Sequence, residues 1–392
     1  MKILHLTSSM DPALGGLTAC IRALAPHLAE LGHPSEIVCL DGPNEPFLKA
    51  IPSAVHALGP PRLGYSYARR LQPWLDTHAA CFDAVIVHGL WQYHGYALHR
   101  ALARPGSPRY FVFPHGMLDP WFKRTYPLKH LKKWAYWWLA ERRILLDAAA
   151  VLFTCEEERR LARLSFGGST YRERVVAFGT ASPPDDGIAQ QTRFFTQQPG
   201  LRDRPFWLFL GRIHPKKGAD MLIGAYAALA ATGAVLPRLV MAGPCADSGY
   251  LRQLQDHAMA TCPAGAVHWT GMLTGDVKWG ALRAAAAFVL PSHQENFGIA
   301  VAEALACATP VLISDQVNIW REIADDGAGL VEPDTDAGTL RLLERWRALE
   351  DHAREQMRLA ARKSFQRRYE IGAVARSLIG VLQESPTASS HP

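Results

Sequence analysis

Cysteines are few in this sequence, and their spacing matches neither a disulfide-stabilised domain nor a zinc-binding module. The 392 residues include seven cysteines and no C-x-x-C pair, so we expect neither a zinc ribbon nor a disulfide framework. Long apolar runs are also lacking. No stretch reaches the roughly 18 residues of a membrane span, because charges at 141–143 and 147 interrupt the most apolar region. The sequence therefore predicts a protein without disulfides or a membrane-spanning helix.

The start of the chain lacks the pattern of a secretory leader. The apolar run in MKILHLTSSMD is short before polar residues begin, whereas a leader needs an uninterrupted apolar stretch of about 7–15 residues. We therefore expect a cytoplasmic protein with reduced thiols, with at most a peripheral position on the inner face of the plasma membrane.

No strong excess of one charge is present. Lysines and arginines number 42 against 36 acidic residues, for a net charge of +6, which is too mild to indicate a nucleic-acid-binding protein. Hydrophobic residues make up 48% and charged residues 20%, a balance typical of a globular protein with a sizeable core. The length predicts two or three domains.

Short apolar runs alternate with longer amphipathic segments from end to end. Strands separated by helices in this way form a parallel, doubly wound sheet, so the expected class is α/β. In the first half the expected strands are 2–7, 36–40, 84–88, 110–113, 149–153 and 174–178. In the second half they are 206–210, 238–242, 266–270, 287–290 and 310–314.

A segment with several prolines and glutamines interrupts the alternation and predicts a linker over 181–205. We therefore expect a Rossmann-like domain over 1–180 and a second over 206–367, with a helix near 368–385 packing back on the first. Ligands of such sheets bind outside the carboxyl ends of the strands, so two facing domains would form a cleft between them.

A basic turn follows the expected strand 206–210 and reads LGRIHPKKG. Arg212 and Lys217 flank a short loop, and a helix beginning near Gly218 would direct its amino-terminal dipole at the same place. Two cations and free backbone N–H groups suit a diphosphate. The alternative is a solvated basic turn.

Two acidic residues follow the expected strand 287–290, in SHQENFGIAVAEAL. Glu295 and Glu303 would lie roughly 12 Å apart along a helix axis. Carboxylates accept hydrogen bonds, so this spacing suits ribose hydroxyls at one side chain and a hexose at the other. The alternative is that both are ordinary residues at the start and middle of a helix, with Glu295 favoured by the helix dipole.

The first turn carries two consecutive glycines before a helix. Gly15 and Gly16 do not follow the G-x-G-x-x-G order, and no aspartate follows at the usual distance, so a dinucleotide-dependent dehydrogenase is disfavoured. Such a turn still lets the backbone approach a bulky ligand closely. The alternative is a simple helix-entry turn.

Together these residues resemble family 4 of the retaining glycosyltransferases, which have the GT-B fold of two Rossmann-like domains. The resemblance spans nearly the whole chain. Its residues are the Gly15-Gly16 turn, the Pro114-His115-Gly116 loop, Arg212 and Lys217, and the E-x7-E pair Glu295 and Glu303. The sequence departs from the family at Ala308, where glycine is common. No D-x-D stands at a strand end in the first half, so a metal-bound donor is not indicated.

The resemblance implies a transferase that uses a UDP- or GDP-sugar as donor, without a cofactor or metal. His115, Glu295, Arg212 and Lys217 would be the catalytic group, with the two cations stabilising the departing diphosphate. Glu303 would bind the ribose, and His115 would contact the donor sugar. Whether the retaining step is a double displacement or a front-face reaction stays open. The donor-binding residues would be Gly15, Gly16, Arg212, Lys217, Met272, Leu273, Asn296, Phe297, Gly298 and Glu303.

Two segments of the first half suggest the acceptor side. HGLWQYHG contains His88, Trp91, Tyr93 and His94, which would form an acceptor wall or, alternatively, a packed loop. Residues 121–143 place lysines and arginines before a cluster of aromatic residues. Cationic helices with tryptophan lie at membrane interfaces, so this segment predicts contact with an anionic membrane and a polyprenyl-diphosphate-linked acceptor. The alternative is a buried aromatic helix with a solvated basic face.

The expected function is hexosyl transfer to a glycan or lipid-linked acceptor in bacterial surface polysaccharide synthesis, as for exopolysaccharide or lipopolysaccharide. A sugar-nucleotide epimerase of GT-B fold and a soluble disaccharide synthase are alternatives within enzymes. A catalytically silent protein that binds sugar nucleotides is the alternative from another class. No nucleic-acid partner is expected.

Overall fold

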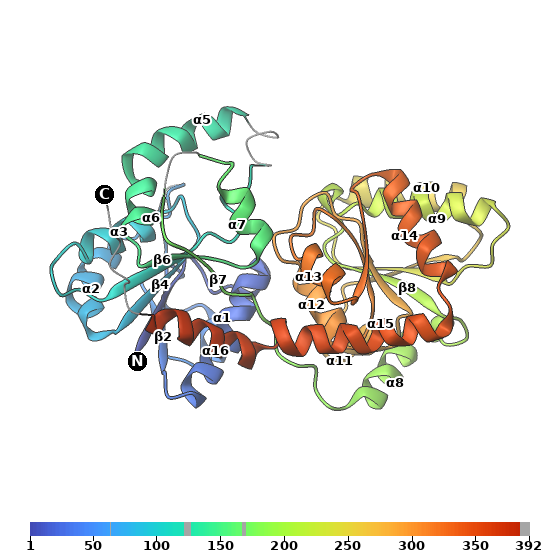
Figure 1. Cartoon of the computed structure of the whole chain (residues 1–392), viewed down its shortest axis with the longest axis horizontal. Coiled ribbons are helices and arrows are strands. Elements are labelled where there is room, and N and C mark those ends of the chain that lie inside the picture. The colour runs from blue at the N-terminus through green and yellow to red at the C-terminus, as the bar shows by residue number, and fades with distance from the viewer. Residues whose placement is uncertain (63, 121–126, 167–169, 385–392) are drawn as a thin grey trace. The chain divides into compact units, whose positions relative to one another are not determined.

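A computed structural model describes residues 1–62, 64–120, 127–166 and 170–384, apart from the side chains of 127–130. The chain divides into two compact units. Unit 1 comprises Met1–Thr180 and Ile371–Pro392, and unit 2 comprises Ala181–Glu370. Each unit is built on its own parallel sheet with helices beside it (Figure 1).

Unit 1 has a seven-stranded sheet in the order β3-β2-β1-β4-β5-β6-β7, with every pair parallel. The strand order reverses between β1 and β4, the topological switch point where such sheets bind ligands. The strands are β1 Ile3–Leu6, β2 Ser35–Cys39, β3 Val55–Ala57, β4 Ala84–His88, β5 Arg109–Phe113, β6 Ala150–Phe153 and β7 Glu173–Val175. The helices are α1 Gly16–Glu30, α2 Leu71–His78, α3 Tyr93–Ala101, α5 Pro127–Tyr136, α6 Arg142–Leu146, α7 Glu156–Ala162 and α16 Ile371–Gln383.

Unit 2 has a six-stranded parallel sheet in the order β10-β9-β8-β11-β12-β13. Its switch point lies between β8 and β11. The strands are β8 Phe206–Leu210, β9 Arg238–Ala242, β10 Val267–Gly271, β11 Ala287–Leu290, β12 Val311–Ser314 and β13 Gly329–Glu332. The helices are α8 Gly187–Gln197, α9 Ala219–Ala231, α10 Ser248–Thr261, α11 Gly275–Ala284, α12 Ile299–Ala306, α13 Trp320–Asp325, α14 Asp336–Ala348 and α15 Asp351–Ser364.

The central strands form the cores of both units. Every residue of β4, β8 and β11 is buried, as expected for parallel sheets that helices cover on both faces. Their sequences AVIVH, FWLFL and AFVL are accordingly apolar almost throughout. The predicted α/β class with two doubly wound parallel sheets is confirmed.

Helix α16 belongs to unit 1, although it ends the described chain. It packs on α1, and its first residue donates an N–H bond to Thr180 O at 3.1 Å. At its other end the Arg109 guanidinium donates to Leu382 O and Glu384 O, both at 2.6 Å. The chain therefore returns to unit 1 through a helix held at both ends.

Residues 181–205 differ from the linker that the sequence suggests, because they contain α8. This helix packs on α11 of unit 2. Gln190 and Phe194 lie one turn apart and are both fully buried. A Cβ at Gly280 of α11 would overlap Gln190 O, so the two helices pack closely. The prolines at 183 and 184 precede the helix, and they do not disrupt it.

Candidate functional site

The loops after β8 and β11 meet at the carboxyl edge of the unit 2 sheet. Lys216 O accepts hydrogen bonds from His293 N and Ser292 Oγ, both at 2.9 Å. Gly218 is in the left-handed region with φ +66°, and a Cβ there would overlap Pro291 O. Only glycine fits this close approach. The two loops are therefore joined by backbone contacts at the switch point.

Lys217 and Glu295, one from each loop, form an ion pair. Their side chains are only 17% and 21% exposed. Burial, with added repulsion from Lys216 and Arg212, lowers the pKa of Lys217 to about 7. Arg212 itself is exposed. The structure thus brings three predicted residues together as a partly buried ion pair beside an exposed cation.

The loop from Glu295 to Gly298 has a fixed backbone. Glu295 N donates to Gln316 O, and Glu295 O accepts from Asn318 N, both at 2.9 Å. Gly298 has φ +80°, and a Cβ there would lie 3.3 Å from Glu295 Cγ. Phe297 is 4% exposed and packs edge-on against Tyr369, so it anchors the loop. The amino-terminal N–H groups of α12 begin directly after this loop, where anions are favoured.

Glu303 lies on α12 and pairs with a residue that sequence reasoning missed. Lys278 Nζ of α11 lies 2.6 Å from Glu303 Oε1. The side chains of Lys278 and Glu303 are 23% and 12% exposed. No sequence motif relates positions 25 residues apart on two helices, so only the fold shows this pair.

Three backbone loops meet at the ends of β8, β9 and β10. A Cβ at Gly243 would overlap Gly211 O, and Gly243 N donates to Gly271 O at 2.8 Å. Beyond them, Met272 is 67% exposed, whereas Leu273 is buried. Of these two predicted donor-binding residues, Met272 is therefore accessible and Leu273 packs inward.

The first turn of unit 1 is organised by an aspartate that the sequence analysis did not single out. Asp41 accepts from Ser9 Oγ at 2.5 Å and from Met10 N at 2.7 Å. Gly15 has φ +92° and caps α1, and Gly16 is the first residue of that helix. The turn is therefore held in place while Gly15 stays exposed.

His115 follows β5 in a strained turn with φ +50°. Its neighbour Gly116 donates an N–H bond to Glu158 Oε1 at 2.5 Å, and Thr154 N donates to Glu158 Oε2 at 2.6 Å. Glu158 is buried on α7, and sequence reasoning missed it. Burial lowers the pKa of His115 to about 3, so the ring is neutral near pH 7.

Two of the four predicted acceptor residues are interior, which corrects part of that expectation. His88 is 4% exposed and His94 is fully buried, because α3 turns His94 inward to bond His88 O at 3.0 Å. Trp91 N donates to Glu141 Oε2 and Trp91 Nε1 to Met117 O, both at 3.3 Å. Neither histidine can line a surface. Trp91 and Tyr93 are half-buried.

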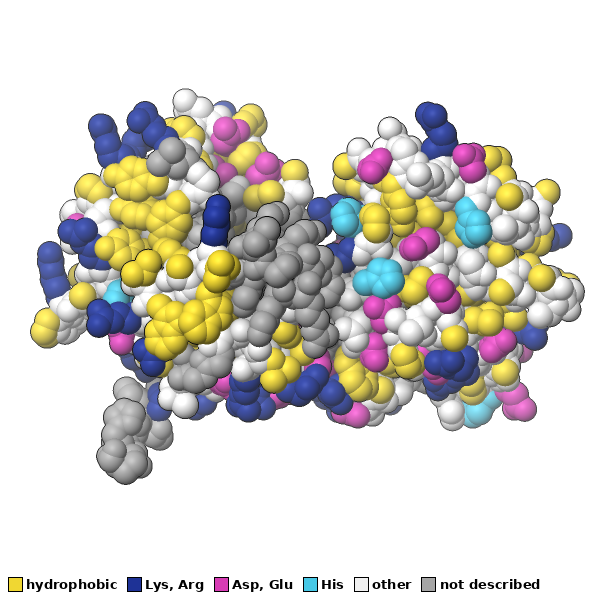
Figure 2. Space-filling model, turned by 90° about the horizontal axis from the view of Figure 1, so that it is seen from above, with side chains coloured by type: hydrophobic (Ala, Val, Ile, Leu, Met, Phe, Trp, Pro, Cys, Tyr) yellow, Lys and Arg dark blue, Asp and Glu magenta, His cyan; other side chains and the backbone are white. Residues whose placement is uncertain are grey.

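Residues 121–143, the basic aromatic segment, divide into a buried and an exposed part. Residues 121–126 lie outside the described residues, and of 127–130 only the backbone is described. In the π-helical turn Trp137–Glu141, Trp137 is 2% exposed and stacks on Phe166. Four apolar side chains are instead exposed: Leu131, Trp134, Trp138 and Leu139. Seen from the side of α5, unit 1 shows hydrophobic side chains beside lysines and arginines (Figure 2).

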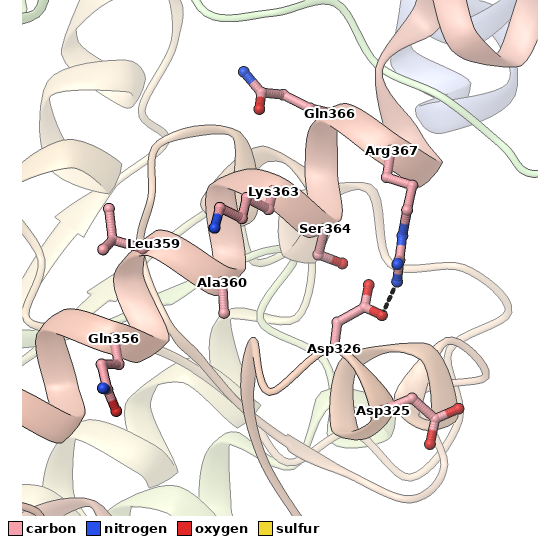
Figure 3. A pocket seen from close by; sticks show the side chains of 9 residues that line it. All are labelled: Asp325, Asp326, Gln356, Leu359, Ala360, Lys363, Ser364, Gln366 and Arg367. Atoms are coloured by element: carbon pink, nitrogen blue, oxygen red, sulfur yellow. Dashed lines mark hydrogen bonds and ion pairs between the residues drawn. The ribbon is translucent and has the colours of Figure 1, made fainter.

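A separate cavity of about 860 Å³ lies in unit 2 between α13, α15 and the π-helical turn Phe365–Tyr369 (Figure 3). Asp326 and Arg367 form an ion pair there, and the Lys363 side chain points away from them. No predicted site residue lines this cavity. Among the described residues, no group of three metal-ligating side chains is placed to hold a metal ion. No helix within the described ranges is long and apolar enough to cross a membrane.

Comparison with known proteins places both units in one group. Residues 15–179 match the family described as glycosyl transferase 4-like domain, and residues 191–364 match glycosyl transferases group 1. D-inositol 3-phosphate glycosyltransferase of Jonesia denitrificans is 26% identical over 265 residues, which cover 64% of this chain and 61% of that protein. The chain thus spans about half to three-fifths of the length of such curated relatives.

Two solved structures share the fold. Sucrose-phosphate synthase from Thermosynechococcus elongatus aligns with a TM-score of 0.75 and 20% identity, over 97% of this chain and 98% of that one. Anabaena HepE, solved in complex with UDP and glucose, aligns with a TM-score of 0.74 and 16% identity, over 97% and 99%. The fold is therefore GT-B, and with its two matched domains the chain belongs to the group 1 glycosyltransferases of the GT4-like type.

Proposed function

We propose that this protein is a retaining hexosyltransferase that uses a nucleoside-diphosphate sugar, UDP- or GDP-linked, as donor. We further propose that it acts on a glycan or lipid-linked acceptor in the synthesis of a bacterial surface polysaccharide. The observation that carries the first proposal is the Lys217–Glu295 pair beside Arg212 at the carboxyl edge of β8 and β11.

The ion pair suggests how a donor would be bound. A diphosphate arriving beside Arg212 would compete with Glu295 for the Lys217 ammonium, because the diphosphate of a nucleotide sugar carries two negative charges and the carboxylate carries one. Lys217 would then be fully protonated. Glu295 would be released to accept hydrogen bonds from sugar hydroxyls, with the backbone N–H groups of 296–298 beside it. This change of partner at Lys217, from Glu295 to the diphosphate, would link binding of the diphosphate to formation of the sugar-binding site.

The chemistry follows from where charge develops. As the bond from the anomeric carbon to the diphosphate oxygen breaks, negative charge grows on the diphosphate, and Arg212 and Lys217 stabilise that state most. An acceptor oxygen forms the new bond to the same carbon, and its proton passes to the departing phosphate in a front-face reaction. Glu303, held by Lys278, would accept from the ribose hydroxyls. His115 would contact the donor sugar.

The acceptor proposal rests on the exposed side chains of the basic aromatic segment. Leu131 and Leu139 are 71% and 80% exposed, and Trp134 and Trp138 are 42% and 54% exposed. The Arg142 guanidinium lies 5.3 Å from the Trp138 ring centroid. Exposed tryptophans with adjacent cations suit the headgroup region of an anionic membrane, where a polyprenyl-diphosphate-linked acceptor would be found.

A small phosphorylated acceptor is the alternative, and the name of the curated relatives favours it, since those proteins are called D-inositol 3-phosphate glycosyltransferases. The structure of unit 2 supports the donor half of the reaction in either case. An acceptor panel containing inositol 3-phosphate, sugar phosphates and polyprenyl-diphosphate glycans would separate the two.

Thermal unfolding with UDP-, GDP- and ADP-sugars tests the donor proposal. A donor at 100 times its Kd stabilises by about 2.7 kcal/mol, which raises Tm by roughly 5–10 °C in a unit of this size. We expect that shift with a UDP- or GDP-sugar, and retention of the anomeric configuration in the product by NMR. No shift with any nucleotide sugar would contradict the proposal.

A further inference from the structure

Three histidine rings form a continuous hydrogen-bonded row inside unit 1. His5 Nδ1 of β1 lies 3.0 Å from His88 Nε2 at the end of β4, and His88 Nδ1 lies 3.0 Å from His115 Nε2 after β5. Neighbouring rings are nearly parallel, at 20° and 13°. The row crosses three adjacent strands of the sheet and ends at a predicted site residue. We call it the histidine row.

The hydrogen bonds of the row depend on one another. A neutral imidazole has one N–H donor and one bare nitrogen acceptor. Each bond in the row needs one of each, so all three rings must point their donors in the same direction. The tautomer of His115 is therefore fixed by His88, and that of His88 by His5.

The inner end of the row favours one direction. His5 Nε2 is buried and has no hydrogen-bond partner within the described part of the chain. In one direction this atom would be an N–H donor without an acceptor, and in the other a bare nitrogen. Among buried backbone groups, an N–H without a partner is rarer than an underused carbonyl, and we apply the same preference to the imidazole N–H. Donors therefore point outward, from His5 Nδ1 to His88 and from His88 Nδ1 to His115.

Resting on the function proposed above, we propose that His5 and His88 are positioning residues that hold His115 as its neutral Nδ1–H tautomer. His115 then presents a fixed N–H donor to an oxygen of the donor sugar. Its Nε2 is occupied by His88, so it cannot accept a proton from the acceptor hydroxyl. In this account His115 orients the sugar and takes no part in proton transfer.

The surroundings of the row support three neutral rings. Burial lowers the pKa of His5 to about 4 and that of His115 to about 3. Burial, with His115, His5 and His94 around it, also keeps the pKa of His88 well below its ordinary value. Glu158 from α7 accepts from Gly116 N and from Thr154. Phe113 and Phe178 pack against the His115 ring.

Nitrogen-15 NMR of the imidazoles in the full-length protein tests the tautomer directly. At pH 7, without ligand, we expect the His115 proton on Nδ1. A proton on Nε2, or a charged ring, would overturn the proposal. This readout needs no turnover, so it stands or falls separately from the proposed transferase activity.

Two substitutions at His5 test whether His5 fixes the tautomer of His115 through His88. His5→Asn keeps an amide donor near the Nδ1 position, whereas His5→Leu removes it and keeps much of the bulk. We expect His5→Leu to give mixed His115 tautomers and to lower kcat at least tenfold, and His5→Asn to recover kcat to within about threefold of wild type. Ile3→Val on the same strand is the control, since it perturbs the core beside the row. It should lower Tm while leaving the His115 spectrum unchanged. Equal spectra and rates in both His5 variants would contradict the assignment.

Discussion

The sharpest prediction concerns the pH dependence of nucleotide binding at Lys217. In the free protein burial and repulsion from Lys216 and Arg212 lower its pKa to about 7, and these effects outweigh the opposing attraction of the paired Glu295 carboxylate. A bound diphosphate favours the charged ammonium and raises that pKa. Binding above pH 7 must therefore take up a proton. The affinity is fully present below pH 7 and falls as the pH rises past it, by up to about tenfold per pH unit.

The expected change of nucleotide affinity with pH follows from the pKa of Lys217 in the free protein. Between pH 7 and 8.5 the protonated fraction of a group with a pKa of about 7 falls about 16-fold, equivalent to ~1.6 kcal/mol of binding free energy. The terminal phosphate of UDP or GDP ionises near pH 6, so the ligand itself hardly changes over this range. Isothermal titration at both pH values, in two buffers of different ionisation enthalpy, measures the affinity and the proton uptake together.

Lys217→Arg is the matched control. A guanidinium stays charged at both pH values, so this variant should bind UDP or GDP with nearly equal affinity at pH 7 and 8.5 and without proton uptake. Lys217→Met should bind UDP or GDP weakly at both pH values. An affinity of the wild type that does not change with pH, or the same pH dependence in Lys217→Arg, would show that Lys217 takes up no proton on binding.

Three further predictions test the surrounding structure. Gly218→Ala should lower Tm and weaken nucleotide binding, because alanine costs about 1–2 kcal/mol at positive φ and its Cβ would overlap Pro291 O. Gly224→Ala is the control, because Gly224 faces open space within α9, and it should leave Tm unchanged or raise it. Equal changes in Tm for the two variants would contradict the close approach at Gly218. Glu303→Gln should weaken the binding of UDP or GDP by about tenfold, since hydrogen bonds to charged groups contribute about 1.5–3 kcal/mol. It should not change the affinity for a 2′,3′-dideoxy analogue of the same nucleotide. Equal losses of affinity for both ligands, measured by calorimetry, would exclude the ribose contact. Replacing Trp134 and Trp138 by serine should abolish flotation with anionic liposomes while Leu31→Ser does not; unchanged flotation would remove the membrane contact.

Much of the fold could be predicted because its central strands are continuous apolar runs. The expected strand 206–210 is β8 itself, and 36–40 lies one residue from β2. The strands that were missed, β3 and β13, are three and four residues long and only partly buried, so neither gives a strong apolar signal. The segment 181–205 was misread because its prolines precede a helix that has only a few inward-facing residues.

The predicted site residues follow strands whose ends could be located, whereas their partners come from elsewhere in the chain. Lys278 and Asp41 lie on other elements, and their bonds to Glu303 and to the first turn depend on packing. The histidine row joins positions 83 and 27 residues apart. No local pattern marks His5 as more than one residue of a buried strand. Sequence reasoning therefore located loops, and the structure supplied the contacts that hold them.

The contribution of the second phosphate to nucleotide binding shows most directly whether Arg212 and Lys217 form a diphosphate site. Calorimetric titration should compare UDP with UMP, and GDP with GMP, in wild type and in an Arg212→Met, Lys217→Met double variant. If the residues at the carboxyl edge of β8 and β11 bind a diphosphate, wild type will bind the favoured nucleoside diphosphate more tightly than its monophosphate. We expect a difference of at least about tenfold, or ~1.4 kcal/mol, and the double variant will lose that difference. Equal binding of mono- and diphosphates to wild type, or a difference that survives in the double variant, would contradict it.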